Sequence, residues 1–125
     1  MSERVVMLGA SNNPHRAAFE AIEALTHHGH EVVPVNPRLT AIGGHPCVSE
    51  LVDVKGGVDT ITVYLRAELA EPLGDAMIEL NPRRVIFNPG SESGALKQQL
   101  EAAGIEVQWQ CTLVLLRSGQ YQRKH

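Results

Sequence analysis

The chain has 125 residues, of which 43% are hydrophobic and 20% are charged. These values predict a single domain over residues 1–125 and exclude a disordered tail, a collagen and a disulfide scaffold. Eleven Lys and Arg residues against fourteen Asp and Glu residues give a formal net charge of −3, and aromatic residues make up only 4%. A nucleic-acid surface normally has a basic excess or stacking aromatics, so we expect no nucleic-acid partner.

The compartment is predicted from features that the sequence lacks. The first residues do not follow the charged-then-apolar plan of a secretion signal, and no apolar run approaches the roughly 20 residues of a membrane helix. The two cysteines, Cys47 and Cys111, are far apart and do not form a C-x-x-C pair. We therefore expect a cytoplasmic protein with reduced thiols and no membrane partner.

Short β-branched runs alternate with helical patterns along the chain. The first strand is predicted over 5–9, and a helix should follow it, with Asn13 as N-cap, Pro14 at its first position and Gly29 at its end. The second strand, 31–35, contains Pro34, which lacks a hydrogen-bond donor and is unusual in a central strand. A loop over 38–46, a very short edge strand at 47–48 and a helical turn at 49–52 come next.

The second half of the chain repeats the alternation. The clearest strand spans 59–65, and a helix with an apolar face is predicted from near Pro72 to Asn81. A strand at 84–87 leads to a helix capped by Ser91 and closed by Gly104. The last strand is 105–108, and the segment 111–116 fits either a short helix or a further strand. Arg83 and Arg84 are expected on a solvated face.

This alternation predicts an α/β fold: a single Rossmann-like, open, mainly parallel sheet of about five to six strands with helices on both faces. Ligands of such sheets bind beyond the carboxyl ends of the strands, where the strand order reverses. That rule selects the loops 9–16, 36–38, 65–68 and 88–92.

The first loop indicates a phosphate site. Gly9 permits a tight turn, Ser11 carries a hydroxyl, and His15 and Arg16 lie next to the start of a helix, whose free N–H groups attract anions. The loop contains neither G-x-G-x-x-G nor the Walker Lys-Ser/Thr pair. A purely structural strand–turn–helix is the alternative.

The end of the second strand carries an arginine in place of an acid. An NAD site needs a carboxylate there for the ribose diol, whereas this sequence has Val35-Asn36-Pro37-Arg38. A guanidinium at this position favours a ribose that bears a phosphate, as in NADP or coenzyme A. A solvated loop arginine is the alternative.

Five segments together give the chain a family resemblance. They are Gly9-Ala10-Ser11-Asn12-Asn13-Pro14-His15-Arg16, Val35-Asn36-Pro37-Arg38, Ile42-Gly43, Ser49-Glu50-Leu51 and the strand that opens at Asp59. From about Arg4 to Leu116 it resembles the standalone CoA-binding proteins, which are similar to the CoA-binding Rossmann domain of the succinyl-CoA synthetase α subunit. The resemblance implies coenzyme A as cofactor. It does not extend to the phosphohistidine segment of the ligase, so ligase activity is not implied.

The resemblance also implies a binding residue set. The pyrophosphate would lie against Gly9, Ala10, Ser11 and Arg16, in the motif that includes Pro14, and the adenosine 3′-phosphate end against Val35, Asn36, Pro37 and Arg38. Leu65 and Arg66 would form another wall of the site. Asn88, Pro89 and Gly90 would face the pantetheine arm, although this segment departs from the commonest family pattern.

Other residues offer weaker candidates for chemistry. His27, His28 and His30 straddle a helix end and lack a fourth ligand at regular spacing, so we expect no metal site. Neither cysteine stands in a recognisable Cys-His motif, and no catalytic residue set emerges. A carrier, sensor or regulatory role for CoA or acyl-CoA binding is therefore favoured. A small NADP-dependent oxidoreductase and an accessory subunit of a CoA ligase remain alternatives, and the chain could form a homodimer.

Overall fold

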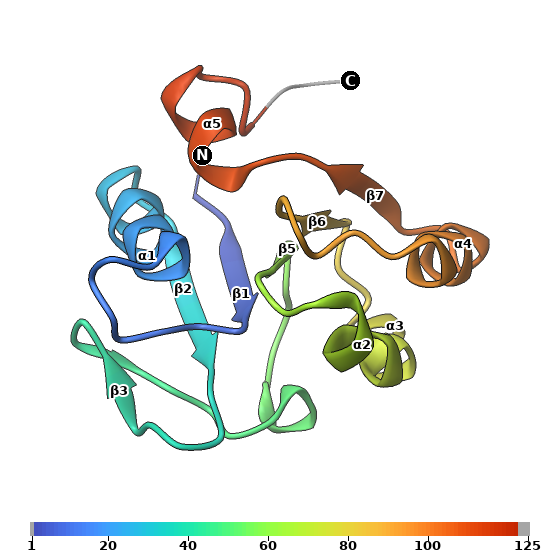
Figure 1. The fold of residues 1–125 in the computed structure, drawn as a ribbon, viewed down its shortest axis with the longest axis horizontal. Helices are drawn as coiled ribbons and strands as arrows, with labels where there is room; N and C mark the ends of the chain where they lie inside the picture. Colours follow the sequence, from blue (N-terminus) through green and yellow to red (C-terminus); the bar gives the residue numbers. More distant parts are fainter. Residues whose placement is uncertain (1, 123–125) are drawn as a thin grey trace.

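The computed structural model, which describes residues 2–122, contains a five-stranded sheet in the order β2-β1-β5-β6-β7 (Figure 1). Every neighbouring pair in this sheet is parallel. The α/β, Rossmann-like prediction is thereby confirmed. The strands are β1 (Arg4–Leu8), β2 (Glu31–Val35), β5 (Thr60–Val63), β6 (Arg84–Phe87) and β7 (Glu106–Trp109).

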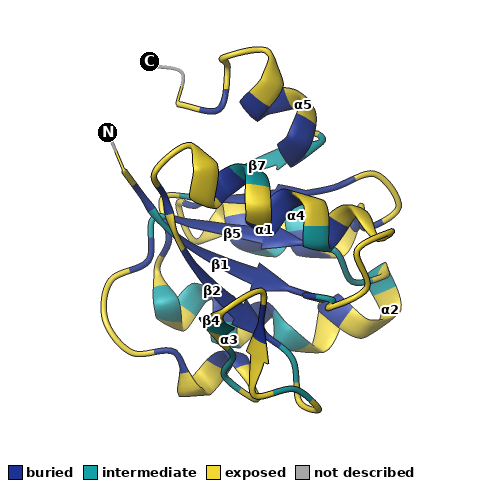
Figure 2. Ribbon diagram, turned by 90° about the vertical axis from the view of Figure 1, so that its left-hand side faces the viewer, coloured by how far each residue is buried: buried dark blue, intermediate teal, exposed yellow. Residues whose placement is uncertain are grey.

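Helices cover both faces of this sheet, which Figure 2 shows as a buried layer between exposed helical surfaces. One face carries α1 (Ala17–His27) and α5 (Thr112–Arg117). The other carries α2 (Ala67–Ala70), the 3-10 helices η1 (Leu51–Asp53) and η2 (Glu71–Leu73), α3 (Gly74–Leu80) and α4 (Gly94–Ala102). Successive residues of β1 point alternately into the two cores, so this central strand reads as a continuous apolar run.

The strand order reverses between β1 and β5. After β1 the chain adds β2 on one side, then crosses back and adds β5, β6 and β7 on the other side of β1. The loops that follow β1 and β5 therefore diverge, and this divergence is the point where open α/β sheets bind ligands.

The prolyl residue in β2 is tolerated because β2 is the edge strand of the main sheet. The Pro34 carbonyl accepts the Val48 N–H at 3.0 Å, and the Asn36 N–H donates to the Val48 carbonyl at 2.9 Å. The predicted edge strand at 47–48 is reduced to this one bridge between Val35 and Val48. The predicted loop before it contains a hairpin of β3 (Ala41–Ile42) and β4 (His45–Pro46), which is too short to leave a periodic pattern.

The predicted start of the first helix is wrong by three residues. The Ser11 hydroxyl accepts the Asn13 N–H at 3.1 Å and the Asn13 side chain accepts the His15 N–H at 3.0 Å, so both side chains form turns before the helix. The helix begins only at Ala17, with Arg16 in an extended conformation as N-cap. Pro14 belongs to the turn and does not occupy the first helical position.

The predicted cap of the later helix is also wrong. The Ser91 N–H donates to the Asn88 carbonyl at 2.9 Å and closes the turn after β6. Ser93 is the N-cap, and its side chain accepts the Leu96 N–H at 3.2 Å. The two alternatives for segment 111–116 are decided in favour of a helix, α5.

The expectation that Arg83 and Arg84 lie on a solvated face is wrong for Arg84. Its side chain is 11% exposed and lies 3.5 Å from the carboxylate of Glu3, which is itself 6% exposed. A buried carboxylate needs cationic and hydrogen-bonding partners, and the amino ends of adjacent strands bring them together. Arg83 remains exposed but also pairs with Glu3, at 3.0 Å.

None of the helices within residues 2–122 is long and apolar enough to cross a membrane. In the same part of the chain, no group of three or more His, Cys, Asp or Glu side chains is arranged to hold a metal ion. His30 instead accepts the Glu3 N–H on its Nδ1 atom at 2.9 Å.

Candidate functional site

The loops after β1 and β5 are in direct backbone contact at the switch point. Gly9 has φ +79°, and a Cβ atom placed on it would lie 2.9 Å from the Tyr64 carbonyl carbon and 3.0 Å from the Leu65 nitrogen. The Tyr64 N–H donates to the Leu8 carbonyl at 2.8 Å, which continues the ladder up to this point. Only glycine fits this position, because any side chain would clash with the backbone of the loop after β5.

The first loop ends at a helix whose leading N–H groups are available. The N-cap of α1 is Arg16, and no side chain of the described residues makes a capping hydrogen bond there. The first N–H groups of a helix have no partner inside it and carry partial positive charge. Ser11 is half-buried and Pro14 and Arg16 are exposed, so the loop presents backbone donors, a hydroxyl and a guanidinium to solvent.

Asn36 joins the loop after β2 to the loop after β1. Its amide Nδ2 donates to the Ala10 carbonyl at 3.0 Å, and its Oδ1 accepts the Arg38 N–H at 2.8 Å. Ala10 and Val35 are buried, whereas Pro37 and Arg38 are exposed. The side chain of Asn36 thus fixes the backbone that carries the arginine relative to the glycine turn.

The third predicted segment lies next to the glycine. The Leu65 side chain is half-buried, and its Cδ2 atom would be 3.1 Å from a Cβ on Gly9. Arg66 is the N-cap of α2, is 72% exposed, and lies 4.0 Å from the equally exposed Glu68. This long contact leaves most of the guanidinium in solvent.

The fourth predicted segment is divided between a buried residue and an exposed turn. Asn88 is 1% exposed. Its Nδ2 donates to the Thr62 hydroxyl and to the Val63 carbonyl, both at 2.8 Å, and its Oδ1 accepts the Thr112 N–H at 2.8 Å. Pro89 and Gly90 follow it on the surface. The side chain of Asn88 is therefore committed to joining β5, β6 and α5.

The arginines at the two edges of the sheet differ in whether they form ion pairs. At the amino edge, Arg4 pairs with Glu31, and Arg83 and Arg84 pair with Glu3. At the carboxyl edge, Arg16 and Arg38 form no ion pair with any described residue. Among the arginines within residues 2–122, Arg16 and Arg38 are therefore the two without an ion pair, and both lie where the first two loops meet the solvent.

All four predicted segments follow strands that are neighbours in the sheet, so they share its carboxyl edge.

The sequence interpretation did not single out Tyr64, although it directly follows a strand. Its ring is half-buried there, and burial raises the pKa of its phenol. Burial likewise raises the pKa of the Cys47 thiol, which favours its protonated form.

Comparison with known proteins gives a family model described as a CoA binding domain, which matches residues 3–117. The uncharacterized protein YneT of Bacillus subtilis (strain 168) is 30% identical over 78 residues, which is 62% of this chain and 58% of that protein's length. A crystal structure of an uncharacterized protein superposes with a TM-score of 0.91 at 37% identity, over 96% of this chain and 98% of that one.

A larger enzyme contains a similar fold. The dinucleotide-forming acetyl-coenzyme A synthetase 1 of Ca. Korarchaeum cryptofilum, solved with phosphate and ADP, superposes with a TM-score of 0.72 at 19% identity. The match covers 84% of this chain but only 25% of that one. At this identity the comparison concerns the fold alone.

Proposed function

Because the chain belongs to the family of CoA binding domains, we propose that it binds coenzyme A or an acyl-CoA at the carboxyl edge of its parallel sheet. The observation that carries this proposal is that two arginines, Arg16 and Arg38, form no ion pair with any described residue. These arginines lie on either side of the Asn36–Ala10 hydrogen bond. Coenzyme A supplies a pyrophosphate and a ribose 3′-phosphate, which match two separated cations.

The pyrophosphate lies, in this proposal, against the loop after β1. Gly9, Ala10 and Ser11 let its oxygens approach the backbone, Pro14 holds the turn, and Arg16 adds charge at the uncapped start of α1. Uncapped N–H groups and a guanidinium are both strong partners for phosphate oxygens.

The 3′-phosphate is assigned to the loop after β2. Arg38 gives it charge-assisted hydrogen bonds, while Val35, Asn36 and Pro37 set the position of the arginine. The Asn36 hydrogen bond to Ala10 keeps the two phosphate positions at a fixed separation.

The pantetheine arm is assigned to the loops after β5 and β6. Leu65 and Arg66 form one wall, and Pro89 and Gly90 form the other. Asn88 acts through the backbone of its turn, since its own polar atoms are bonded inside the protein. We assign the chain a carrier, sensor or regulatory role in the cytoplasm, without catalytic residues.

The experiment is a thermal-shift titration with coenzyme A, dephospho-CoA and NADPH. A ligand that binds only the folded protein raises the Tm. We expect coenzyme A to bind about tenfold more tightly than dephospho-CoA, the effect of one charge-assisted phosphate contact. The variant Arg38→Ala should remove this difference, whereas Arg16→Ala should weaken both ligands.

The matched control is Lys55→Ala, which removes an exposed cation that precedes β5 at the opposite edge. It should keep the full preference for coenzyme A. If coenzyme A and dephospho-CoA bind equally to the unaltered protein, the role given to Arg38 is wrong. If NADPH binds more tightly than coenzyme A, the oxidoreductase alternative replaces the proposal.

A further inference from the structure

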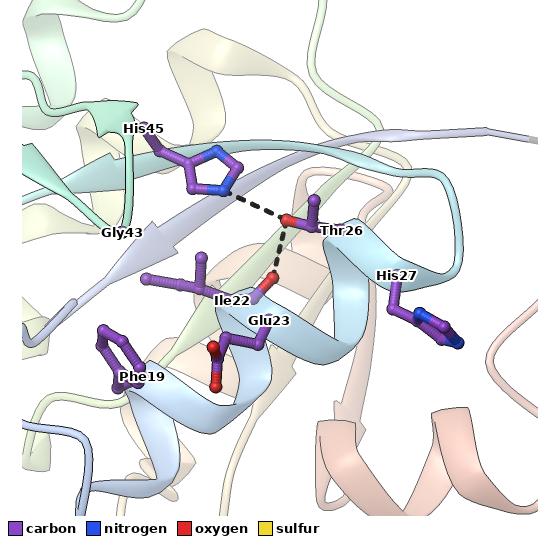
Figure 3. A pocket seen from close by; sticks show the side chains of 7 residues that line it. All are labelled: Phe19, Ile22, Glu23, Thr26, His27, Gly43 and His45. Carbon is purple, nitrogen blue, oxygen red and sulfur yellow. Dashed lines mark hydrogen bonds between the residues drawn. The ribbon is translucent and has the colours of Figure 1, made fainter.

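A cavity of about 320 Å³ lies between α1 and the β3–β4 hairpin (Figure 3). None of the residues proposed to hold coenzyme A lines it. Its volume is at the lower end of the range for small-molecule sites, which is roughly 300–1,000 Å³. The cavity is therefore large enough for a small molecule or a single side chain.

The inner wall of the cavity is apolar. Ile22 is 1% exposed and belongs to the core beneath α1, and the half-buried ring of Phe19 lies beside it. Across the opening, a Cβ on Gly43 would still be 3.9 Å from the Phe19 ring. The wall can accept an aliphatic stem and an aromatic contact.

The hydrogen-bond donors of Thr26 and His45 in the wall are already used. Thr26 donates its hydroxyl hydrogen to the Ile22 carbonyl at 2.8 Å. The contact of 3.2 Å between the Thr26 oxygen and His45 Nε2 must then be a donation from the imidazole. Figure 3 shows both bonds as dashed lines among the residues that line the cavity. Neither group has a hydrogen left for an anionic ligand.

Glu23 is the acidic side chain among the residues that line the cavity, which also include the imidazoles of His27 and His45. Glu23 forms no ion pair or hydrogen bond with any residue in the range 2–122 and lies one helical turn after Phe19. Glu23 and Phe19 line the cavity from successive turns of α1, while the His27 ring points away from both in Figure 3. A carboxylate next to an aromatic ring attracts a cation through charge and through the ring quadrupole.

We propose that this cavity binds an organic cation, namely a primary ammonium or guanidinium group on a short apolar stem. Glu23 pairs with the cation, Phe19 contacts it through its ring, and the stem lies against Ile22. The cation supplies the donors that Thr26 and His45 cannot offer. Its source is either a free amine or the side chain of a peptide.

The test is a titration of the ligand-free protein with butylammonium chloride, followed by amide chemical shifts. We expect saturable shifts at Phe19, Thr26, Gly43 and His45, and none with 1-butanol, which has the same shape without charge. The variant Glu23→Gln should bind about fivefold more weakly, the upper range for an exposed ion pair. The control Glu79→Gln, an exposed charge on the other face of the sheet, should not change binding.

A second arm uses a blocked Gly-Lys-Gly peptide: tighter binding of the peptide than of butylammonium identifies a peptide source, and weaker binding identifies a free amine. Equal shifts with 1-butanol, unchanged binding by Glu23→Gln, or stronger shifts with inorganic phosphate would overturn the proposal. Loss of the butylammonium titration at saturating coenzyme A would also overturn it, because the cavity would then belong to the cofactor site. If coenzyme A does not bind and butylammonium does, the cavity proposal stands and the proposed function fails.

Discussion

The backbone of Tyr64 lies so close to Gly9 that a Cβ atom on the glycine would be 2.9 Å from the Tyr64 carbonyl carbon. The neighbouring parallel strands β1 and β5 thus end at a contact that leaves no room for a side chain, and the chain continues from them toward opposite sides of the sheet order. The proposed pyrophosphate loop begins at this contact.

The first prediction follows from it. Gly9→Ala should lower the free energy of unfolding by about 2 kcal/mol or more, since the left-handed conformation at φ +79° costs an alanine about 1–2 kcal/mol and the steric overlap adds to this. Urea unfolding measures the change. The control is Gly44→Ala, which has φ +83° but no atom within 4 Å of the added carbon. Equal losses in the two variants would show that the contact with Tyr64 is unimportant.

The fold was predictable because its main signals are local. The buried β-branched runs of the strands, the proline at the edge position of β2 and the glycines after helices all act within a few residues. The start of α1 was not predictable in this way. Ser11 and Asn13 favour both caps and turns, and the choice depends on which backbone N–H groups their side chains meet.

The site was predictable at the level of loops but not of side-chain roles. Strand ends identify Gly9, Arg38 and Asn88 as residues of one edge, because parallel strands end together. Whether a side chain faces solvent or joins two strands depends on partners far away in the sequence. Asn88 contacts Thr62 and Thr112, 26 and 24 residues away, and no periodic pattern records such contacts.

The second prediction concerns the buried carboxylate at the amino edge. Glu3 accepts the Thr60 hydroxyl at 2.9 Å and pairs with Arg83 and Arg84. Glu3→Ala leaves the nearly buried guanidinium of Arg84 without its counter-charge, so we expect a loss of about 3 kcal/mol in the free energy of unfolding.

The matched control for this prediction is Glu31→Ala. Glu31 pairs with Arg4 at 3.0 Å, but its side chain is 65% exposed. An exposed pair contributes about 0.5 kcal/mol. Urea unfolding of both variants at neutral pH compares them directly, and similar losses would mean that burial of Glu3 does not determine the strength of this cluster.

The third prediction is a loss of stability in mild acid that depends on His30. Burial lowers the pKa of His30 below its ordinary value of 6.5, an effect that the Glu3 carboxylate opposes and that His28 and Arg84 reinforce. The folded protein also needs the neutral ring, because Nδ1 accepts the Glu3 N–H at 2.9 Å. The unfolded chain therefore binds a proton at a higher pH than the folded protein does.

The sign of the effect follows from this difference. The stability due to neutral His30 is fully present above about pH 6.5 and is lost as the pH falls through the lowered value, because the unfolded state binds more protons in that interval. We expect urea unfolding to give a smaller free energy at about pH 5.5 than at about pH 7.5. In His30→Asn, whose amide oxygen can accept the Glu3 N–H but does not titrate, the difference between the two pH values should shrink. An undiminished difference in that variant would assign the acid sensitivity to other groups.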